Sequence, residues 1–223
     1  SKNQILEEKL KAAGVGGAVS EVKETFYDQV ASSSPAPGGG SVAASCGVLS
    51  AALTAMVCRL TVSKKKYEAV KDELSCLRDK ADALRAELTQ LIDTDKEAFN
   101  AVMAAFKLPK SSDEDVVKRD AAIEAATKGA ALVPLTVVRK SIEVLELALV
   151  VAQKGNENSI SDAGVAGLTG LAAVEGAGYN VRINLKNLTD KAFVEKTTAE
   201  ITALRARGAQ LAAEIKTVVE SKL

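Results

Sequence analysis

The segment SVAASCGVLSAALTAMVCRLTV, Ser41–Val62, decides the class of fold to which this chain belongs. Its one charged residue is Arg59, and its length suits about six turns of α-helix. A membrane span needs a similar length, but much of this segment consists of Ala, Gly, Ser and Thr. We therefore predict a helix that is buried on all sides within a soluble protein and does not enter a membrane.

The composition of the 223-residue chain favours further helices around this core. Aromatic residues make up only 3% and Trp is absent, so Ala, Val, Leu and Ile must fill the interior. Small side chains suit closely packed helices better than sheets, which prefer aromatic and β-branched residues. The length suits one core. We predict an all-α bundle of six or seven helices.

Apolar spacing and breakers outline these helices. Residues 1–19 are expected to form an N-terminal helical extension, and residues 20–223 to form the main domain. Pro134 is expected to kink a helix or to start a new one. The alternation within 179–185 leaves a short strand there as an alternative. Besides the extension at about 1–13, the expected helices span about 20–31, 41–62, 67–107, 113–133, 134–153, 159–185 and 190–222, which makes six or seven depending on whether Pro134 kinks one helix or starts another.

Charge and residue types exclude several classes of function. Lys+Arg and Asp+Glu both number 29, so no overall field attracts nucleic acid or an anionic membrane. The chain has no His, which excludes imidazole bases, His-containing triads and HExxH zinc sites. Cys46, Cys58 and Cys76 form no C-x-x-C pair, so we expect free, buried thiols and no metal site. The charged N-terminus shows no signal peptide, and we expect a cytoplasmic protein.

A glycine-rich loop, Pro35–Ser41, leads into the central helix. Glycines allow close approach of a ligand to the backbone and positive φ angles. The helix N-terminus favours a carboxylate or a polar heterocycle. An ordinary interhelical loop is the alternative. The candidate binding residues here are Pro37, Gly38, Gly39, Gly40 and Ser41.

Two charged segments follow. The run Lys64–Tyr67 lies beyond the far end of the central helix, where its lysines can hold an anionic group; a solvated surface is the alternative. Asp95 shares the apolar register of Leu88, Ile92 and Phe99. A carboxylate on a buried stripe needs a partner or a function, although a solvated position is equally compatible with the pattern.

Asparagines mark two further candidate sites. Asn156 and Asn158 precede an apolar helix and can both donate and accept hydrogen bonds. Asp162 lies near the start of that helix, where it is either a functional carboxylate or a simple cap. Asn180 and Asn184 lie four residues apart on one helix face, which indicates a polar network or a ligand surface.

Taken together and in this order, these motifs resemble the cyclodeaminase/cyclohydrolase family of tetrahydrofolate one-carbon enzymes. The resemblance covers about Tyr27 to Leu223. It is similar to stand-alone methenyltetrahydrofolate cyclohydrolases and to the cyclodeaminase domain of the bifunctional formiminotransferase-cyclodeaminase, whose transferase part is missing here. The matching segments are 34–44, 64–67, 95–99, 108–110, 133–135, 155–156, 161–162 and 180–184.

The resemblance implies an all-helical homodimer that binds a tetrahydrofolate derivative and uses no further cofactor. Both family reactions pass through a tetrahedral carbon between N5 and N10, so each needs a base and an acid. With no His, the candidate catalytic residues are Asp95, Asp162 and Lys66. The glycine loop with Lys65, Tyr67, Asn156, Asn158, Asn180 and Asn184 would bind the substrate. We expect folding to gather these residues into one pocket.

The favoured reaction is hydrolysis of 5,10-methenyltetrahydrofolate to 10-formyltetrahydrofolate, because the chain has the single-domain form of the stand-alone members. Cyclodeamination of formiminotetrahydrofolate, which releases ammonia, is the first alternative. A non-catalytic helical module that binds folate or a partner is the second. Pairs of Asn inside helices argue against the second, because a scaffold alone has no need of them.

Overall fold

The computed structural model describes residues 24–223, which divide between two compact units at Ser34 and Pro35. The described part of the first unit holds α2 (Phe26–Ala31). Thr25 caps α2, because its hydroxyl accepts from the N–H of Asp28 while the Asp28 carboxylate accepts from the N–H of Thr25. The helix expected from about residue 20 therefore begins, within the described residues, at Phe26. The expected extension, 1–19, lies outside the described residues.

The second unit confirms the all-α prediction. It contains α3 (Gly39–Val62), α4 (Lys71–Phe106), α5 (Asp113–Lys154), α6 (Ile160–Leu185) and α7 (Lys191–Glu220), with short 3-10 helices η1 (Lys65–Val70) and η2 (Glu157–Ser159). No strand occurs in residues 24–223, so the strand considered for 179–185 is wrong and those residues form the end of α6. The helix expected to start at Tyr67 starts at Lys71, after η1.

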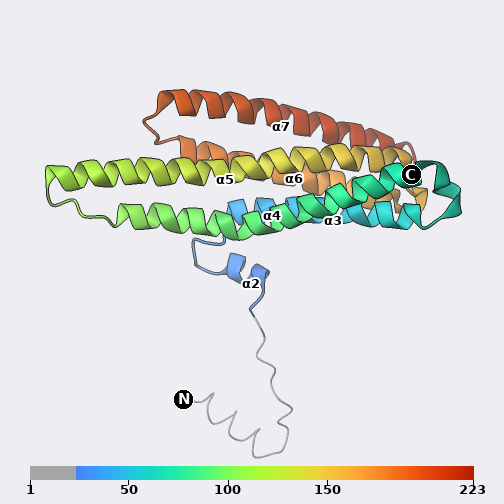
Figure 1. Ribbon diagram of the computed structural model, residues 1–223, viewed down its shortest axis with the longest axis horizontal. Helices are drawn as coiled ribbons and strands as arrows, with labels where there is room; N and C mark the ends of the chain where they lie inside the picture. Colours follow the sequence, from blue (N-terminus) through green and yellow to red (C-terminus); the bar gives the residue numbers. More distant parts are fainter. Residues whose placement is uncertain (1–23) are drawn as a thin grey trace, which may run out of the picture. The chain divides into compact units, whose positions relative to one another are not determined.

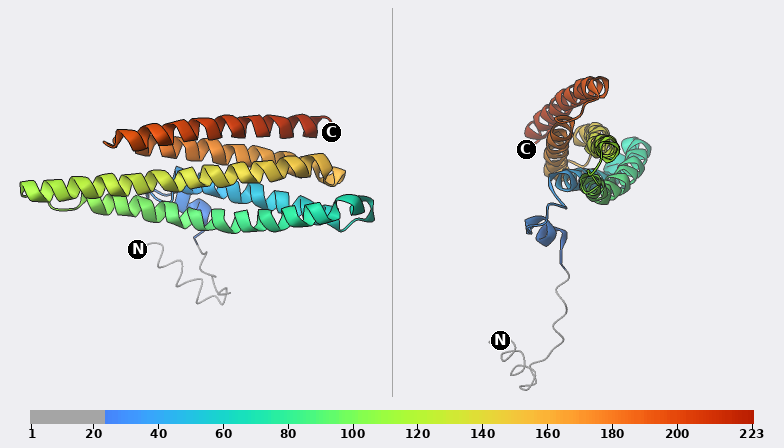
Figure 2. Two further views of the ribbon diagram at one scale, coloured as in Figure 1. Left: turned by 45° about the horizontal axis from the view of Figure 1, so that its top comes forward. Right: turned by 90° about the vertical axis from the view of Figure 1, so that its left-hand side faces the viewer.

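The four helices α3, α4, α5 and α6 pack in a ring in which each contacts the next and α6 contacts α3. The fifth helix, α7, packs on the outside against α5 and α6 (Figures 1 and 2). Leucines and isoleucines fill the centre, and many alanines and glycines let the helices approach closely. The largest fully buried side chains include Leu74, Leu88, Leu135, Leu145, Ile201, Leu211 and Ile215.

The central helix α3 differs from the prediction in one respect, because it is not buried on all sides. Its inner face packs against α4, α5 and α6. Of the most apolar 18-residue stretch of α3, 56% is buried. Its outer face leaves Leu49 49% exposed and Leu60 41% exposed. By length and composition alone α3 is able to cross a membrane, as core helices of soluble proteins also are. The exposed face follows from the position of α3 in a ring, where each helix keeps one side outside.

Pro134 does not divide α5, which runs without a break from Asp113 to Lys154, so the predicted boundary between two helices is wrong. Proline has no N–H, so the carbonyl group of Ala130, four residues earlier, loses its helical donor. The side chain of Asn184 on α6 replaces that donor, with Asn184 Nδ2 2.8 Å from the Ala130 oxygen. A tertiary hydrogen bond thus allows α5 to continue through proline.

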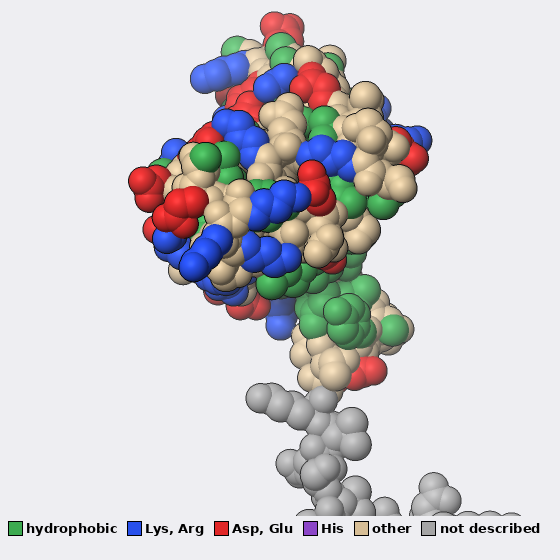
Figure 3. Space-filling view, turned by 90° about the vertical axis from the view of Figure 1, so that its right-hand side faces the viewer, with side chains coloured by type: hydrophobic (Ala, Val, Ile, Leu, Met, Phe, Trp, Pro, Cys, Tyr) green, Lys and Arg blue, Asp and Glu red, His purple; other side chains and the backbone are tan. Residues whose placement is uncertain are grey.

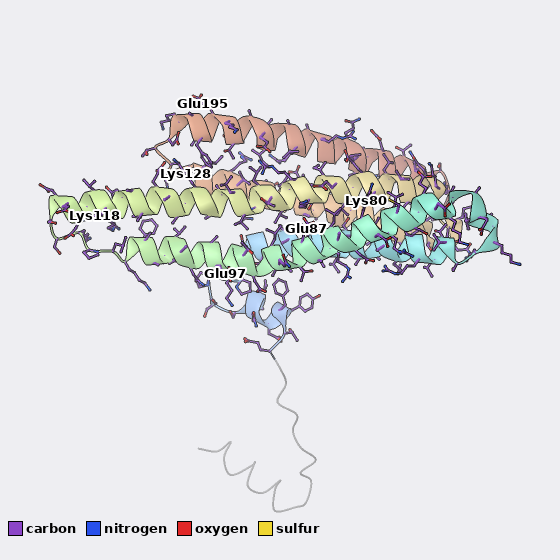
Figure 4. The ribbon with its side chains drawn as sticks, viewed as in Figure 1. Lys80, Glu87, Glu97, Lys118, Lys128 and Glu195 are labelled. Carbon is purple, nitrogen blue, oxygen red and sulfur yellow. The ribbon has the colours of Figure 1, made fainter. Side chains whose placement is uncertain are left out.

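Charged side chains fix the loop between α6 and α7. Glu124 on α5 accepts hydrogen bonds from the backbone N–H groups of Thr189 and Asp190, at 3.0 Å for each nearest contact. Lys128, labelled in Figure 4, lies 2.7 Å from Asp190, which also caps α7 by accepting from the N–H of Phe193. These contacts attach the start of α7 to α5.

All three cysteines are free thiols, as predicted, but they are not all buried. Cys58 is buried, Cys46 is half-buried and Cys76 is exposed. Burial raises the pKa of the Cys58 thiol to about 11, so this group stays protonated.

The close packing of α6 against α5 and α3 at Gly170 can be tested by substitution. A Cβ at Gly170 would lie 2.7 Å from Leu145 Cδ2 on α5 and 2.9 Å from Ser50 Oγ on α3. We expect Gly170→Ala to lower the free energy of unfolding by about 1–3 kcal/mol through overpacking, measured by urea denaturation. Gly129→Ala in α5 is the control: a Cβ there meets nothing within 4 Å. It should raise the stability by about 0.5–1 kcal/mol, because Ala favours helix over Gly. Equal effects of both changes would contradict the close approach at Gly170.

Candidate functional site

The glycine loop brings a carboxylate to the N-terminus of α3. Gly38 is the N-cap, and Gly39 and Gly40 form the start of the first turn. Asp95 of α4 lies against Gly40, where any Cβ would overlap its carboxylate. Ser41 Oγ lies 3.0 Å from Asp95 Oδ2 and 3.1 Å from the carbonyl oxygen of Ile92, so its proton can be donated to either. Asp95 is half-buried. This confirms the prediction that it lies partly on the core side of its helix.

The surroundings of Asp95 suit a group that exchanges protons. Burial raises the pKa of the Asp95 carboxyl above its usual value, and hydrogen bonds from the Ser41 side chain and backbone oppose part of this rise. A carboxyl with a raised pKa holds a proton more readily at the pH of the cell than an ordinary Asp does. Asp95 can therefore take up a proton and give it back.

The glycines act through their lack of a side chain rather than through unusual backbone angles. Gly38 has a φ of −123°, and Gly39 and Gly40 are helical. The positive φ angles expected here are thus absent, because the loop enters α3 directly. A Cβ at Gly39 would lie 3.4 Å from Asn180 Nδ2, so Asn180 of α6 also lies close to this turn. Close approach, not backbone strain, explains the glycines.

The two asparagines of α6 have separate partners. Asn180 Nδ2 donates to the carbonyl oxygen of Gly176, 2.9 Å away, on its own helix. Asn184 Nδ2 donates to Ala130 on α5, as described above. The two side chains therefore share no hydrogen bond and form no common network, and the hydrogen bond of Asn184 gives that residue a structural role. We keep Asn180 as the stronger candidate for contact with a ligand.

Removing the Asn184 amide should destabilise α5 at Pro134, where this amide replaces the missing backbone donor. Asn184→Ala leaves the carbonyl group of Ala130, a buried residue, without its donor. We expect the free energy of unfolding to fall by about 1–3 kcal/mol, measured by thermal or urea denaturation. Asn100→Ala, at an exposed position of α4, is the control and should change the stability by less than about 0.5 kcal/mol. An unchanged free energy of unfolding in Asn184→Ala would show that α5 does not need this hydrogen bond.

A second group of predicted residues lies where η1 and η2 meet. The Tyr67 hydroxyl accepts from the N–H of Glu157 at 3.1 Å, and Lys66 Nζ lies 2.8 Å from Glu157 Oε2. The N–H of Asn156 donates to Thr61 Oγ1 at 2.9 Å, and Asn156 Oδ1 accepts from the N–H of Asn158 at 3.3 Å. These contacts join the end of α3 to the start of α6.

The second group holds both lysines and carboxylates, and Lys66 is paired with Glu157. The hydrogen bond to Glu157 raises the pKa of Lys66, so Lys66 remains a cation and suits charge stabilisation better than proton donation. Asp162 lies half-buried in the first turn of α6, and Ser159 occupies the N-cap position. Figure 3 views the molecule from this end and shows Lys and Arg side chains gathered on it.

The predicted site residues thus form two groups at opposite ends of α3. The glycine-loop group comprises Pro37, Gly38, Gly39, Gly40, Ser41, Asp95, Asn180 and Asn184. The lysine-loop group comprises Lys65, Lys66, Tyr67, Asn156, Asn158 and Asp162. The 24 residues of α3 separate the groups by roughly 36 Å. One chain therefore does not gather them into a single pocket, and Pro37 itself is buried.

Sequence reasoning missed a groove beside the glycine-loop group. The groove has a volume of about 470 Å³ and lies between the end of α6 and the start of α7. Its lining includes Tyr179, Arg182, Ile183, Lys186, Val194 and Thr198. The sequence feature that could have indicated this groove is the pair Arg182 and Lys186, which lie four residues apart and so on one face of the helix. In residues 24–223 no three His, Cys, Asp or Glu side chains are grouped so as to hold a metal ion.

The match to known proteins covers both groups. Residues 22–203 match the sequence profile described as Formiminotransferase-cyclodeaminase. The chain belongs to the formiminotransferase-cyclodeaminase family. Within this family, the chain is similar to a Methylorubrum extorquens protein named methenyltetrahydrofolate cyclohydrolase, with 47% identity over 206 residues. The matched part is 92% of this chain and 99% of that protein.

Two other relatives place the chain within the formiminotransferase-cyclodeaminase family. The rat formimidoyltransferase-cyclodeaminase is 37% identical over 179 residues, which are 80% of this chain but 33% of the rat protein. The crystal structure of formiminotetrahydrofolate cyclodeaminase from Thermotoga maritima superposes with a TM-score of 0.79 at 32% identity. That match covers 88% of this chain and 94% of the other. The family fold is therefore the five-helix arrangement described above.

Proposed function

We propose that this chain hydrolyses 5,10-methenyltetrahydrofolate to 10-formyltetrahydrofolate. The observation that carries the proposal is the half-buried Asp95 carboxylate, held against Gly40 at the N-terminus of α3 in a chain without His. The similarity to the M. extorquens cyclohydrolase, over 99% of its length, supports hydrolysis in particular. We further propose that no cofactor or metal is needed beyond the folate substrate.

The chemistry that we propose uses Asp95 twice. As a base, its carboxylate takes one proton from a water molecule, whose oxygen forms a bond to the methenyl carbon. As an acid, it then returns that proton to N5 while the bond between N5 and this carbon breaks. The second proton of the water is released when the carbonyl group of the N10-formyl product forms. A carboxyl with a raised pKa can perform both steps.

The other predicted residues have supporting roles in this proposal. Asn180 and the backbone at Gly39 would bind the pterin ring, because amides can both donate and accept. Lys65 and Lys66 would hold the negatively charged glutamate tail of the substrate and stabilise charge. Tyr67, Asn156, Asn158 and Asp162 would shape that part of the site. Since the groups lie apart in one chain, we propose a homodimer, active in the cytoplasm and without nucleic-acid or membrane partners.

The expected activity can be followed directly. Purified protein mixed with 5,10-methenyltetrahydrofolate should remove the near-UV chromophore of the substrate faster than buffer alone, with 10-formyltetrahydrofolate as the product by chromatography. A rate equal to that of buffer, with stable folded protein, would rule out hydrolysis.

Cyclodeamination is the second candidate, because the T. maritima structure named as a cyclodeaminase shares this fold at 32% identity. In that reaction N10 forms a bond to the formimino carbon and its proton passes to the formimino nitrogen. A second proton, which Asp95 supplies, lets this nitrogen leave as ammonia while the bond between it and the carbon breaks and the 5,10-methenyl product forms. Release of ammonia from formiminotetrahydrofolate without hydrolysis of the methenyl compound would favour it. Binding of either folate without turnover would favour the non-catalytic module instead.

A further inference from the structure

The hydroxyl group of Ser41 is buried at the point where α3 and α4 meet. Ser41 is the third residue of α3, and it is fully buried. Its Oγ atom lies 3.0 Å from Asp95 Oδ2 and 3.1 Å from the carbonyl oxygen of Ile92, and both acceptors belong to α4. These contacts link the role of the hydroxyl to Asp95 rather than to a ligand.

The backbone of Ser41 also binds the Asp95 carboxylate. The first backbone hydrogen bond of α3 runs from the N–H of Val42 to the carbonyl oxygen of Gly38, so the N–H of Ser41 has no acceptor within its own helix. Gly38, the N-cap residue, has no side chain that could supply one. Asp95 accepts from this N–H as well as from the hydroxyl, and it thereby replaces the missing cap. Two donors of one residue thus hold the carboxylate of another helix.

The contact with Ser41 gives the two oxygens of the Asp95 carboxylate different surroundings. Oδ2 faces the Ser41 hydroxyl, whereas Oδ1 is the atom of Asp95 nearest to the position that a Cβ of Gly40 would occupy. A carboxylate that a buried donor holds at one oxygen cannot turn freely about its Cβ–Cγ bond. Oδ1 therefore has a fixed direction, beside the space that Gly40 leaves.

We propose that Ser41 is a positioning residue for the reaction at Asp95. It holds Oδ2, so that Oδ1 is the oxygen that takes the proton from water and returns it to N5. Ser41 then acts through Asp95 and is not one of the residues that bind the substrate, as its motif predicted. The role of Oδ1 rests on the proposed function, because it requires a proton transfer at Asp95.

A second acceptor lets the Ser41 hydroxyl follow the charge of Asp95. While Asp95 is ionised, donation to Oδ2 is a charge-assisted hydrogen bond, which is the stronger choice. When Oδ1 carries a proton, Oδ2 is a weaker acceptor, and the hydroxyl can turn to the carbonyl oxygen of Ile92. That oxygen has two lone pairs, so it can accept this bond beside a helical one. The buried hydroxyl thus keeps a partner in both states of Asp95, and no state carries the penalty of an unpaired donor.

The polar surroundings of Asp95 come from Ser41 rather than from charged side chains. The pKa of the Asp95 carboxyl is raised by its burial and, in the opposite direction, lowered by the hydrogen bonds from Ser41. The first turn of α3 carries no charged residue. On the neighbouring helices, Lys128 of α5 and Glu175 of α6 are each held in an ion pair. The charged residues next to Asp95 on α4 are exposed to water, which screens them: Asp93, Lys96 and Glu97.

Ser41→Cys tests this role with little change in packing. A thiol is a weak donor, so the ionised form of Asp95 loses support and its pKa should rise. Because Asp95 must be ionised to act as a base, the fall of kcat toward low pH should begin at a higher pH than in the wild type. At neutral pH we expect kcat to drop about 10–100-fold, since the carboxylate is also less well oriented. KM should stay the same, because Ser41 does not touch the substrate.

Ser41→Ala removes the donor altogether and should change the pH profile in the same direction, so either variant decides if the other does not fold. A raised KM with an unmoved pH profile would show that Ser41 binds the substrate, and would overturn the proposal. Wild-type kcat and pH profile in both variants would do the same.

Ser50→Ala is the matched control. Ser50 is a fully buried serine of the same helix, and its hydroxyl donates to the carbonyl oxygen of Ala166 at 2.7 Å. Its loss should lower the free energy of unfolding but leave kcat and the pH profile unchanged. An equal shift of the pH profile in Ser50→Ala would mean that any buried defect in α3 causes it, which would also overturn the role of Ser41.

A carbon-13 NMR titration separates this inference from the proposed function. The signal of the Asp95 carboxyl, identified by its absence in Asp95→Asn, reports the pKa without any substrate. We expect this pKa to be higher in Ser41→Cys and Ser41→Ala than in the wild type. If the wild type has no folate activity yet the pKa rises in this way, the proposed function fails and the hold of Ser41 on Asp95 stands. An unchanged pKa in both variants would overturn that hold.

Discussion

Asp95→Asn is expected to lower kcat by about 10²–10⁴-fold, the usual contribution of a positioned acid–base group. Asn has nearly the same shape as Asp and can still accept the hydrogen bond from Ser41, so the fold should be kept. The change removes only the capacity to take a proton from water and to return it to N5. The measurement is kcat for loss of the methenyl chromophore, with circular dichroism to confirm the fold.

Asp93→Asn is the matched control for this prediction. It changes the same residue type on the same helix two positions away, at an exposed place. Its kcat should remain within about 2-fold of the wild type, since surface changes have small effects. Equal kcat values for the two variants would remove Asp95 from the mechanism.

The pH dependence of stability offers an independent check on the environment of Asp95. Its folded-state pKa is raised above the usual 3.8, so the folded protein binds the proton more tightly than the unfolded chain does. That contribution is fully present below 3.8 and is lost as the pH rises through the folded pKa. Asn cannot ionise, so the stability of the wild type relative to Asp95→Asn should decline across this pH range. A relative stability that increases with pH would mean that the carboxylate is not desolvated as described.

Gly40→Ala is expected to lower kcat by about 100-fold, because a displacement near 1 Å at a reacting group can have that effect. The new Cβ would overlap the Asp95 carboxylate and force it away from the N-terminus of α3. Helix α3 itself should tolerate the change, since Ala favours helix over Gly. The measurement is again kcat, together with the pH–rate profile, which should shift because the surroundings of Asp95 change.

Gly176→Ala serves as the control for Gly40→Ala. This glycine also lies in a helix–helix contact, but its added Cβ would meet only the Ala43 Cβ at 3.2 Å and the Ala43 Cα at 4.0 Å. We expect a small effect on stability and a kcat within a few-fold of the wild type. If Gly40→Ala is as active as Gly176→Ala, the position of Asp95 does not depend on the absence of a side chain at Gly40.

Local patterns in the sequence determined the helical class and most helix ends. The small-residue segment 41–62 required close neighbours, and Ser112 and Asp190 cap α5 and α7 through short-range hydrogen bonds. The apolar register placed Asp95 toward the interior because a helix repeats every 3.6 residues. These features depend on residues only a few positions apart.

Only the tertiary structure decided the features that join distant residues. Pro134 lies within one helix because Asn184, 50 residues later, supplies the missing donor, and no local pattern contains that bond. Likewise, the motifs separate into two groups because the direction and length of α3 place its two ends far apart. The sequence therefore determined which residues are candidates for the chemistry, and the packing of helices determined that one chain holds them at two ends.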